Sequence, residues 1–142
     1  AIRGWSFGGY LAALAVLKEP RRFHVAVAGA PVTEWRWYDT HYTERYLGNP
    51  NIDDTPYRRS SLIDGLESLE RPLLLIHGLA ADNVVAAHTL QLSSALLAVG
   101  AQHSVLPLAG VSHMTPQEVV AENLLHLQLS FINEQFPSSV DS

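Results

Sequence analysis

The stretch Gly4-Trp5-Ser6-Phe7-Gly8 is the part of the chain that decides the fold. This G-x-S-x-G pattern is typical of a sharp turn between a strand and a helix, which lifts the serine hydroxyl out of a sheet so that a carbonyl group can approach it. Glycines flank the serine in such a turn because the backbone is strained and larger side chains would clash. Residues 1–3 predict the end of a strand, and the apolar run 9–17 predicts a buried helix. We therefore interpret Ser6 as a nucleophile at a strand–turn–helix elbow.

Strand-like and helical segments alternate along the rest of the chain. The further predicted strands are residues 24–30, 72–77 and 103–108, and the further predicted helices are residues 42–47, 86–99 and 115–136. The strand at 72–77 is a continuous apolar run, as expected where helices cover both faces of a sheet. Pro107 predicts that the last strand lies at an edge or ends there, and Thr115-Pro116-Gln117-Glu118 is typical of a helix start. Alternating strands and helices form a parallel sheet, so the fold class is α/β.

Composition narrows the classes of function. A chain of 142 residues that is 47% hydrophobic fits one globular domain, and a net charge of −5 argues against nucleic acid as a partner. The chain has no cysteine, which excludes disulfides and thiolate chemistry. It has no run of about eighteen apolar residues, so we predict no membrane segment. No metal-ligand spacing or phosphate-binding loop is present, so we expect no metal and no cofactor.

A serine nucleophile needs a base that takes its proton and a carboxylate that orients the base. In α/β-hydrolases these groups follow the serine in the order acid, then histidine, on loops after later strands. Of the seven histidines, only His113 lies in a glycine-bearing loop after the last predicted strand. We therefore predict that His113 is the general base, and that the acid lies in the loop 78–84, after the most apolar strand.

Several longer motifs extend this interpretation. They are residues 4–10, Ala30-Pro31-Val32, residues 35–39, the run Tyr42-Thr43-Glu44-Arg45-Tyr46-Leu47-Gly48, and His77-Gly78. In these motifs, and over nearly its whole length, the chain resembles the prolyl oligopeptidase family of serine peptidases, most closely its dipeptidyl-peptidase branch. The resemblance implies the C-terminal portion of an α/β-hydrolase fold at residues 1–136. The residues themselves predict a polar tail at 137–142. It also implies a peptide substrate cut after a proline or small penultimate residue.

The resemblance assigns roles residue by residue. Ser6 matches the nucleophile, His113 the base, and the backbone amide of Phe7 a donor to the oxyanion. Asn83 matches the amide that holds a substrate carbonyl. The pocket for the penultimate side chain matches Val32, Trp35, Tyr38, Tyr42 and Val84. From the residues alone a small aromatic core is the better reading of this cluster, and the resemblance favours the pocket.

The chain departs from the family pattern at Ala81, where the His-Gly-x-x-Asp motif has its catalytic acid. Asp82 follows and matches the usual second acidic residue. Without the orienting carboxylate, turnover in well-studied triads falls by about 10⁴. Three explanations are open: an engineered inactive variant, a natural non-catalytic homologue, or Asp82 as a substitute acid on a shifted loop. We expect a defective site.

The resulting prediction is a serine peptidase that acts through an acyl-enzyme on Ser6 and is impaired at position 81. The alternatives are an inactive pseudopeptidase that binds peptides or partners, and an esterase or acyl-aminoacyl peptidase on the same fold. Because natural chains do not start inside a catalytic elbow, we expect a C-terminal piece that lacks the preceding hydrolase segment and the family's β-propeller. The first strand would then be central in the complete sheet, so we expect this piece to self-associate, as a homodimer for example, through the exposed edge.

Overall fold

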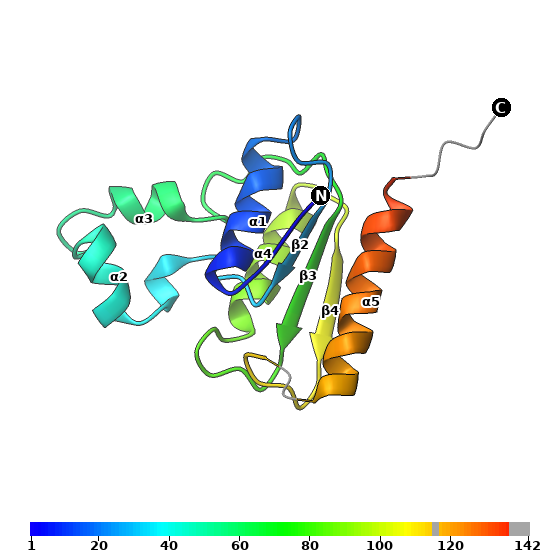
Figure 1. The fold of residues 1–142 in the computed structure, drawn as a ribbon. Coiled ribbons are helices and arrows are strands. Elements are labelled where there is room, and N and C mark those ends of the chain that lie inside the picture. The colour runs from blue at the N-terminus through cyan, green and yellow to red at the C-terminus, as the bar shows by residue number, and fades with distance from the viewer. Residues whose placement is uncertain (115–116, 137–142) are drawn as a thin grey trace.

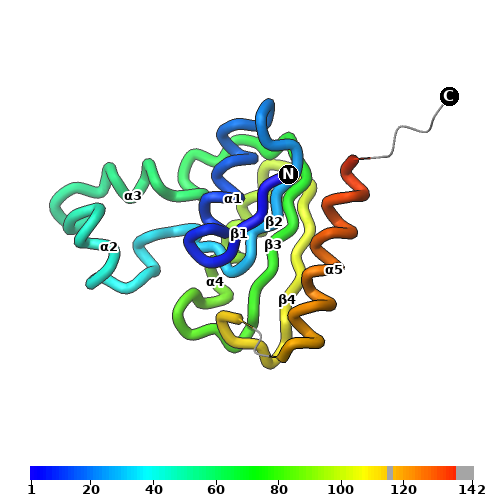
Figure 2. The backbone as a smooth tube through the Cα atoms, in the orientation of Figure 1, coloured from blue at the N-terminus to red at the C-terminus, as the bar shows by residue number. Residues whose placement is uncertain are grey.

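The computed structural model describes residues 1–114 and 117–136, whose path is traced in Figures 1 and 2. Four parallel strands form one sheet in the order β1-β2-β3-β4. They are β1 (Ile2–Trp5), β2 (Ala26–Gly29), β3 (Leu73–Gly78) and β4 (Ser104–Leu108). The strands lie side by side in chain order (Figure 2), each joined to the next by a crossover. The predicted α/β class with a parallel sheet is confirmed.

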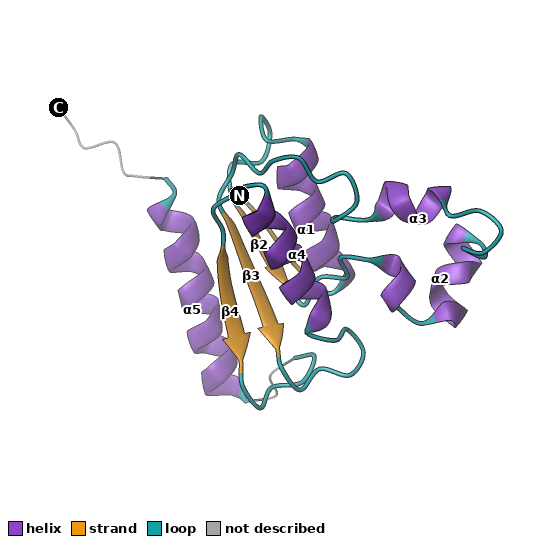
Figure 3. Cartoon of the chain, turned by 180° about the vertical axis from the view of Figure 1, so that it is seen from behind, coloured by secondary structure: helices purple, strands orange, loops and turns teal. Residues whose placement is uncertain are grey.

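Helices cover both faces of the sheet (Figures 1 and 3). Helices α1 (Phe7–Lys18) and α4 (Ala87–Ala98) pack on one face, and α5 (Glu118–Glu134) packs on the other. Alternate residues of β3 serve the two faces: Leu75 joins the larger core under α1 and α4, while Ile76 joins the smaller core under α5. This double burial explains why β3 is apolar throughout its middle. No helix in the described part of the chain is long and apolar enough to cross a membrane.

Some element boundaries differ from the prediction. The strand predicted at 24–30 is limited to Ala26–Gly29, because the next residue, Ala30, has a left-handed φ of 41° and leaves the strand. The last helix begins at Glu118 with no side-chain cap from Gln117, and the predicted start at Thr115-Pro116 lies outside the described residues. The predicted tail, 137–142, also lies outside them. Pro107 occupies β4, which is an edge strand of the described sheet.

Between β2 and β3 the chain leaves the sheet as an aromatic arm, residues 32–60 (Figure 1). The arm contains a short 3₁₀ turn (Trp35–Trp37), α2 (Thr40–Leu47) and α3 (Thr55–Ser60). Helix α2 begins where the Asp39 carboxylate accepts a hydrogen bond from the Tyr42 amide at 2.8 Å, and it ends at Gly48, whose φ is 77°. The helix predicted at 42–47 is therefore confirmed, two residues longer at its start.

One arginine ties the arm together. Arg36 contacts Glu34 at 2.7 Å, Asp54 at 2.9 Å and Asp64 at 3.2 Å. Its guanidinium thus joins the 3₁₀ turn to the residue before α3 and to the segment that returns to the sheet. These carboxylates raise the pKa of Arg36 above its ordinary value, outweighing the opposing effect of burial.

Candidate active site

Ser6 lies between β1 and α1 in a conformation that residues other than glycine rarely adopt. Its φ is 58° and its ψ is −119°. Two backbone hydrogen bonds hold it there: the Ser6 amide donates to the Gly29 carbonyl at 2.8 Å, and the Ser6 carbonyl accepts from the Tyr10 amide at 3.0 Å. A non-glycine residue with such a backbone costs on the order of 1–3 kcal/mol and persists only where its surroundings fix it. The structure therefore has the strained strand–turn–helix geometry that the sequence predicts.

The flanking glycines explain how the turn closes. A Cβ atom added at Gly4 would lie 2.1 Å from the carbonyl oxygen of Gly8, and one at Gly9 would lie 2.4 Å from that of Gly29. Both contacts are with backbone, which cannot move aside. Gly8 itself has open space around its missing Cβ. The first turn of α1 can approach β1 and β2 so closely only because Gly4 and Gly9 lack side chains.

The loops after β3 and β4 are bound to each other by their backbones. The Leu79 amide donates to the Leu108 carbonyl at 3.0 Å, and the Ala80 amide donates to the Val111 carbonyl at 3.0 Å. A Cβ atom at Gly78 would lie 2.1 Å from the Ser112 carbonyl oxygen, so the loops touch at that glycine as well. The predicted acid loop and the predicted base loop are therefore packed side by side.

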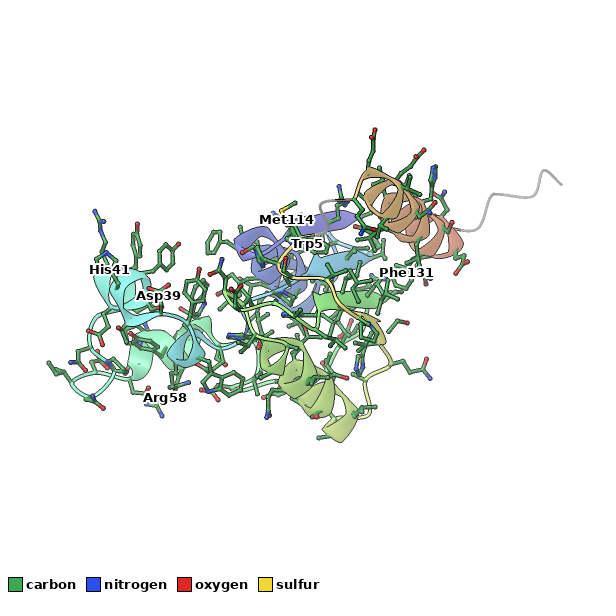
Figure 4. The ribbon with its side chains drawn as sticks, turned by 90° about the horizontal axis from the view of Figure 1, so that it is seen from below. Trp5, Asp39, His41, Arg58, Met114 and Phe131 are labelled. Atoms are coloured by element: carbon green, nitrogen blue, oxygen red, sulfur yellow. The ribbon has the colours of Figure 1, made fainter. Side chains whose placement is uncertain are left out.

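A tryptophan connects these loops to the elbow. The indole Nε1 of Trp5, the residue before Ser6, donates a hydrogen bond to the His113 carbonyl at 2.8 Å. Figure 4 marks the two segments with the labels Trp5 and Met114. Ser6, Ala81 and His113 follow the carboxyl ends of β1, β3 and β4. Because the strands are parallel, all three residues lie at the same end of the sheet. Among the hydrogen bonds of the described residues, none joins the Ser6 hydroxyl to the His113 ring.

The half-buried ring of His113 has one end without a partner. Its Nδ1 atom is buried and makes no hydrogen bond with a described residue. Ala81 is buried, with 9% of its surface exposed, and offers only a methyl group. Asp82 is exposed, and its carboxylate accepts a hydrogen bond from the Asn83 amide at 3.0 Å. The carboxylate of Asp82 is therefore directed to its own loop, and no carboxylate of the described residues is hydrogen-bonded to Nδ1.

His77 has a structural role that sequence reasoning did not assign to it. It is buried at the end of β3, where its Nε2 donates to the Val84 carbonyl at 2.6 Å and its Nδ1 meets the Thr89 hydroxyl at 2.6 Å. Burial, more than the nearby His113, lowers the pKa of His77 below its ordinary value, so the ring is neutral at pH 7. The neutral ring fastens the loop 78–84 to α4. In the sequence, the His77-Gly78 motif could have indicated that His77 has such a role.

An aromatic cavity of about 430 Å³ lies between the elbow and the arm. It is lined by Phe7, Tyr10, Trp35, Tyr42, Thr43, Tyr46, Leu47 and Ser60. Trp35 is its central ring, with centroid distances of 5.3 Å to Tyr10 and 5.9 Å to Phe7. Because Phe7 directly follows Ser6, the cavity begins next to the predicted nucleophile.

The predicted pocket residues divide between the cavity and its surroundings. Trp35 and Tyr42 line the cavity, and Tyr38 meets both edge-on at 5.8 Å and 5.6 Å. Val32 and Val84 are buried in the larger core, while Asn83 is exposed. Sequence reasoning did not predict that Phe7 and Tyr10 of α1, or Tyr46 of α2, line the cavity. The helical spacing of Tyr42 and Tyr46, whose rings lie 5.1 Å apart, could have indicated the latter.

The phenols of Tyr10 and Tyr38 in this region are uncharged. Burial raises the pKa values of Tyr10 and Tyr38 above their ordinary value, so both phenols stay neutral at physiological pH. Among residues 1–114 and 117–136, no group of three His, Cys, Asp or Glu side chains is arranged to hold a metal ion. The cavity wall thus combines apolar ring faces with neutral hydroxyl groups, which suits a ligand of small, largely apolar surface.

Comparisons with known proteins match this geometry. The family model of the prolyl oligopeptidase family matches residues 1–139. Dipeptidyl peptidase 8 of Mus musculus is 46% identical over 102 residues, which is 70% of this chain and 11% of that protein. Dipeptidyl peptidase 4 of Sus scrofa is 36% identical over 129 residues, covering 89% of this chain and 16% of that protein. The crystal structure of Porphyromonas gingivalis dipeptidyl peptidase 4 superposes with a TM-score of 0.88 at 30% identity, covering 94% of this chain and 19% of the other. The chain thus spans less than a fifth of the length of each of these relatives.

Proposed function

The chain belongs to the prolyl oligopeptidase family, in its dipeptidyl-peptidase branch, and from that premise we propose that it is the C-terminal part of a serine peptidase catalytic domain. The observation that carries the proposal is the strained backbone of Ser6, with φ 58°, at the junction of β1 and α1. Strain of this kind is retained where it exposes a reactive group. Ser6 would attack the substrate carbonyl and form an ester, which water then hydrolyses.

Two further groups would assist this step. His113, whose loop is bonded to Trp5, would take the proton from the Ser6 hydroxyl and return it to the leaving amine. The Phe7 amide is the first of α1, so it lacks an intrahelical acceptor and lies at the positive end of the helix dipole. It would donate to the oxyanion that forms on the substrate carbonyl.

The aromatic cavity supports a peptide with proline or a small residue at the penultimate position. A proline ring is flat, apolar and compact, so it can pack against the Trp35 and Tyr42 rings without requiring a charged partner. Tyr38 would support these rings from behind, and Val32 and Val84 would form the floor of the pocket. The exposed Asn83 would hold a substrate carbonyl from the rim.

The proposal includes a defect in the orientation of the base. An imidazole whose Nδ1 has no acceptor is free to adopt the wrong tautomer, and its protonated form is unsupported. The exposure of Asp82 and its bond to the Asn83 amide favour a missing acid over a substitute acid. The same unpartnered Nδ1 favours the pseudopeptidase, which shares the fold and differs only in having no residual turnover.

We also propose that a preceding segment of the parent chain pairs with β1. Within the described sheet β1 has one neighbour, β2, and its other edge is open. An open strand edge next to a catalytic serine attracts a further strand. Isolated residues 1–142 would instead pair with a second copy, which light scattering at increasing concentration would detect as dimers or larger species.

The decisive experiment labels the full-length protein with a fluorophosphonate and compares it with its Ala81→Asp variant. We expect labelling of Ser6 to be weak in the parent and to rise by about 10³ to 10⁴ in rate when the acid is restored. Labelling must be mapped to a peptide, because the Ser93 hydroxyl also has a histidine partner, His103 Nε2 at 2.7 Å. Ser6→Ala in the Ala81→Asp background is the matched control.

Each outcome distinguishes one candidate. Equal and strong labelling of Ser6 in both proteins would identify Asp82 as the working acid. No labelling of Ser6 in either would contradict the peptidase and leave the pseudopeptidase. Rapid hydrolysis of acyl esters together with no cleavage of prolyl peptides by Ala81→Asp would favour the esterase.

A further inference from the structure

The ring of His113, the base of the proposed triad, has a buried nitrogen without a hydrogen-bond partner among the described residues. Nδ1 of His113 is shielded from solvent and has no partner among the described residues. A buried ring nitrogen of this kind is costly unless a hydrogen-bond partner approaches it. In a serine hydrolase the acceptor is a carboxylate, which also stabilises the imidazolium that forms during attack.

The loop that would supply the acceptor has a complete backbone framework. The Ala80 amide is bonded to Val111, the Ala81 amide donates to the Gly78 carbonyl at 3.1 Å, and the Val84 carbonyl is bonded to His77. Ala81 is buried within this framework. An alanine differs from an aspartate by one carboxylate group, and Ala81 stands where the His-Gly-x-x-Asp motif has its acid.

Neighbouring groups do not replace the missing carboxylate. The Asp82 carboxylate is exposed and bonded to the Asn83 amide. Both nitrogens of His77 are used, by Val84 and Thr89. The loop nevertheless lies at the surface: Leu79 is 51% exposed, and Asp82 and Asn83 are exposed as well. A ligand of a few atoms would have to enter from this exposed side of the loop.

We propose that this place binds a small monocarboxylate, formate above all, as a dissociable third member of the triad. The inference rests on the proposed peptidase function of Ser6 and His113. One formate oxygen would accept the Nδ1 proton of His113, while Nε2 takes the proton of the Ser6 hydroxyl. The chain would then be a peptidase that depends on a small anion for its activity.

The size of Ala81 predicts which carboxylates are effective. Formate adds little more than the carboxylate group that alanine lacks. The methyl group of acetate would compete for space with the methyl group of Ala81 in a buried place, where an additional carbon is felt. We expect the order formate, then acetate, then propionate, each with saturation behaviour.

The test measures fluorophosphonate labelling of Ser6 and cleavage of a prolyl dipeptide amide by the full-length protein as sodium formate is increased at constant ionic strength with sodium chloride. We expect both rates to rise at least tenfold and to saturate. The Ala81→Asp variant should be fast without formate and unchanged by it, because its own carboxylate occupies the place. The Ala81→Leu variant, whose larger side chain fills the place, should not respond.

The outcomes separate this inference from the function on which it rests. If Ala81→Asp is active while formate leaves the parent unchanged, the carboxylate site is wrong and the peptidase stands. Equal stimulation when sodium chloride alone is increased in place of formate, or stimulation that increases from formate to propionate, would also overturn the site. If Ala81→Asp is itself inactive, the proposed function fails, and the inference fails with it.

Discussion

The elbow at Ser6 and the loop at Ala81 follow parallel strands of the same sheet, yet they depend on different parts of the chain. At the elbow the backbone determines the geometry: Ser6 is held in a strained conformation by contacts that Gly4 and Gly9 make possible. At the loop the backbone is equally well bonded, but the chemistry depends on one side chain. A substitution can therefore remove the acid from a serine hydrolase site and leave its fold intact, whereas few substitutions at the elbow would be silent.

The largest predicted effect tests the rigidity of the elbow. In Gly4→Ala the new Cβ would lie 2.1 Å from the Gly8 carbonyl oxygen, so the turn must open. We expect a loss of at least about 3 kcal/mol in unfolding free energy, and no labelling of Ser6 even with the acid restored. Urea unfolding of the full-length protein measures the unfolding free energy. Fluorophosphonate labelling measures the reactivity of Ser6.

Gly8→Ala is the matched control for this prediction. Gly8 lies in the first turn of α1 with open space around its missing Cβ. Alanine is favoured over glycine in a helix by up to about 1 kcal/mol, so this variant should be as stable as the parent or more stable. Equal destabilisation by Gly4→Ala and Gly8→Ala would show that the close approach does not determine the fold of the elbow.

Lowering the pH should destabilise the protein through the histidines near the loop 78–84 and not through the elbow at Ser6. Trp5, Ser6 and Phe7 do not titrate, whereas the loop 78–84 lies in the chain between two buried histidines, His77 at the end of β3 and His88 in α4. Burial, with a smaller contribution from His77, lowers the pKa of His88 from 6.5 to about 4. Its Nδ1 accepts a hydrogen bond from the Thr33 amide at 3.1 Å, which only the neutral ring can do.

The sign of the pH effect follows from this shift. The unfolded state takes up a proton near pH 6.5, and the folded state only near pH 4, so stability is fully present above pH 6.5 and falls as the pH drops. The loss by pH 4 is about 3 kcal/mol. Urea midpoints between pH 7 and pH 4 measure it. His88→Gln should flatten the profile, while His41→Gln, at an exposed position, should not; identical profiles for all three proteins would refute the assignment.

An intermediate effect should come from the bond that joins the two regions. Trp5→Phe removes the Nε1 donor to the His113 carbonyl and keeps most of the ring. We expect a loss of about 0.5–1.5 kcal/mol in stability. In the Ala81→Asp background, kcat for a prolyl dipeptide amide should fall by up to about tenfold, because the base is held less well.

Trp37→Phe controls for the loss of an indole elsewhere. The Trp37 ring is 46% exposed and packs against His88 with centroids 5.5 Å apart, and its indole makes no hydrogen bond to the described part of the His113 loop. Its substitution should change stability slightly and kcat not at all. A fall in kcat in Trp37→Phe as large as in Trp5→Phe would mean that the hydrogen bond to His113 has no particular role.

The features that sequence reasoning identified correctly have local causes. The elbow was predictable because a strained serine needs flanking glycines, and β3 because a strand covered on both faces is apolar throughout. Helix α2 was predictable because Asp39 and Gly48 satisfy backbone groups at its two ends. Family membership followed from the same short runs, and the comparisons confirm it.

The features that it missed depend on tertiary packing. Phe7, Tyr10 and Tyr46 line the cavity because of the way the arm approaches α1, whereas Val32 and Val84 belong to the larger core and not to the cavity wall. No local pattern distinguishes an aromatic ring in a cavity wall from one in a core. Nor could the sequence say that Nδ1 of His113 is buried without a partner, since this depends on contacts between two loops far apart in the chain.

The smallest predicted effect concerns Asp82, and it bears most directly on the loop. Asp82→Asn removes the negative charge but keeps an oxygen that can accept the hydrogen bond from the Asn83 amide, now 3.0 Å long. Because the carboxylate is exposed and directed to its own loop, we expect Ser6 labelling rates in the parent background to change less than about threefold. A fall of a hundredfold or more would instead mean that Asp82 reaches His113 during the reaction. The loop 78–84 would then supply the acid by moving toward His113. The elbow would still be rigid, but the loop would be mobile and not incomplete.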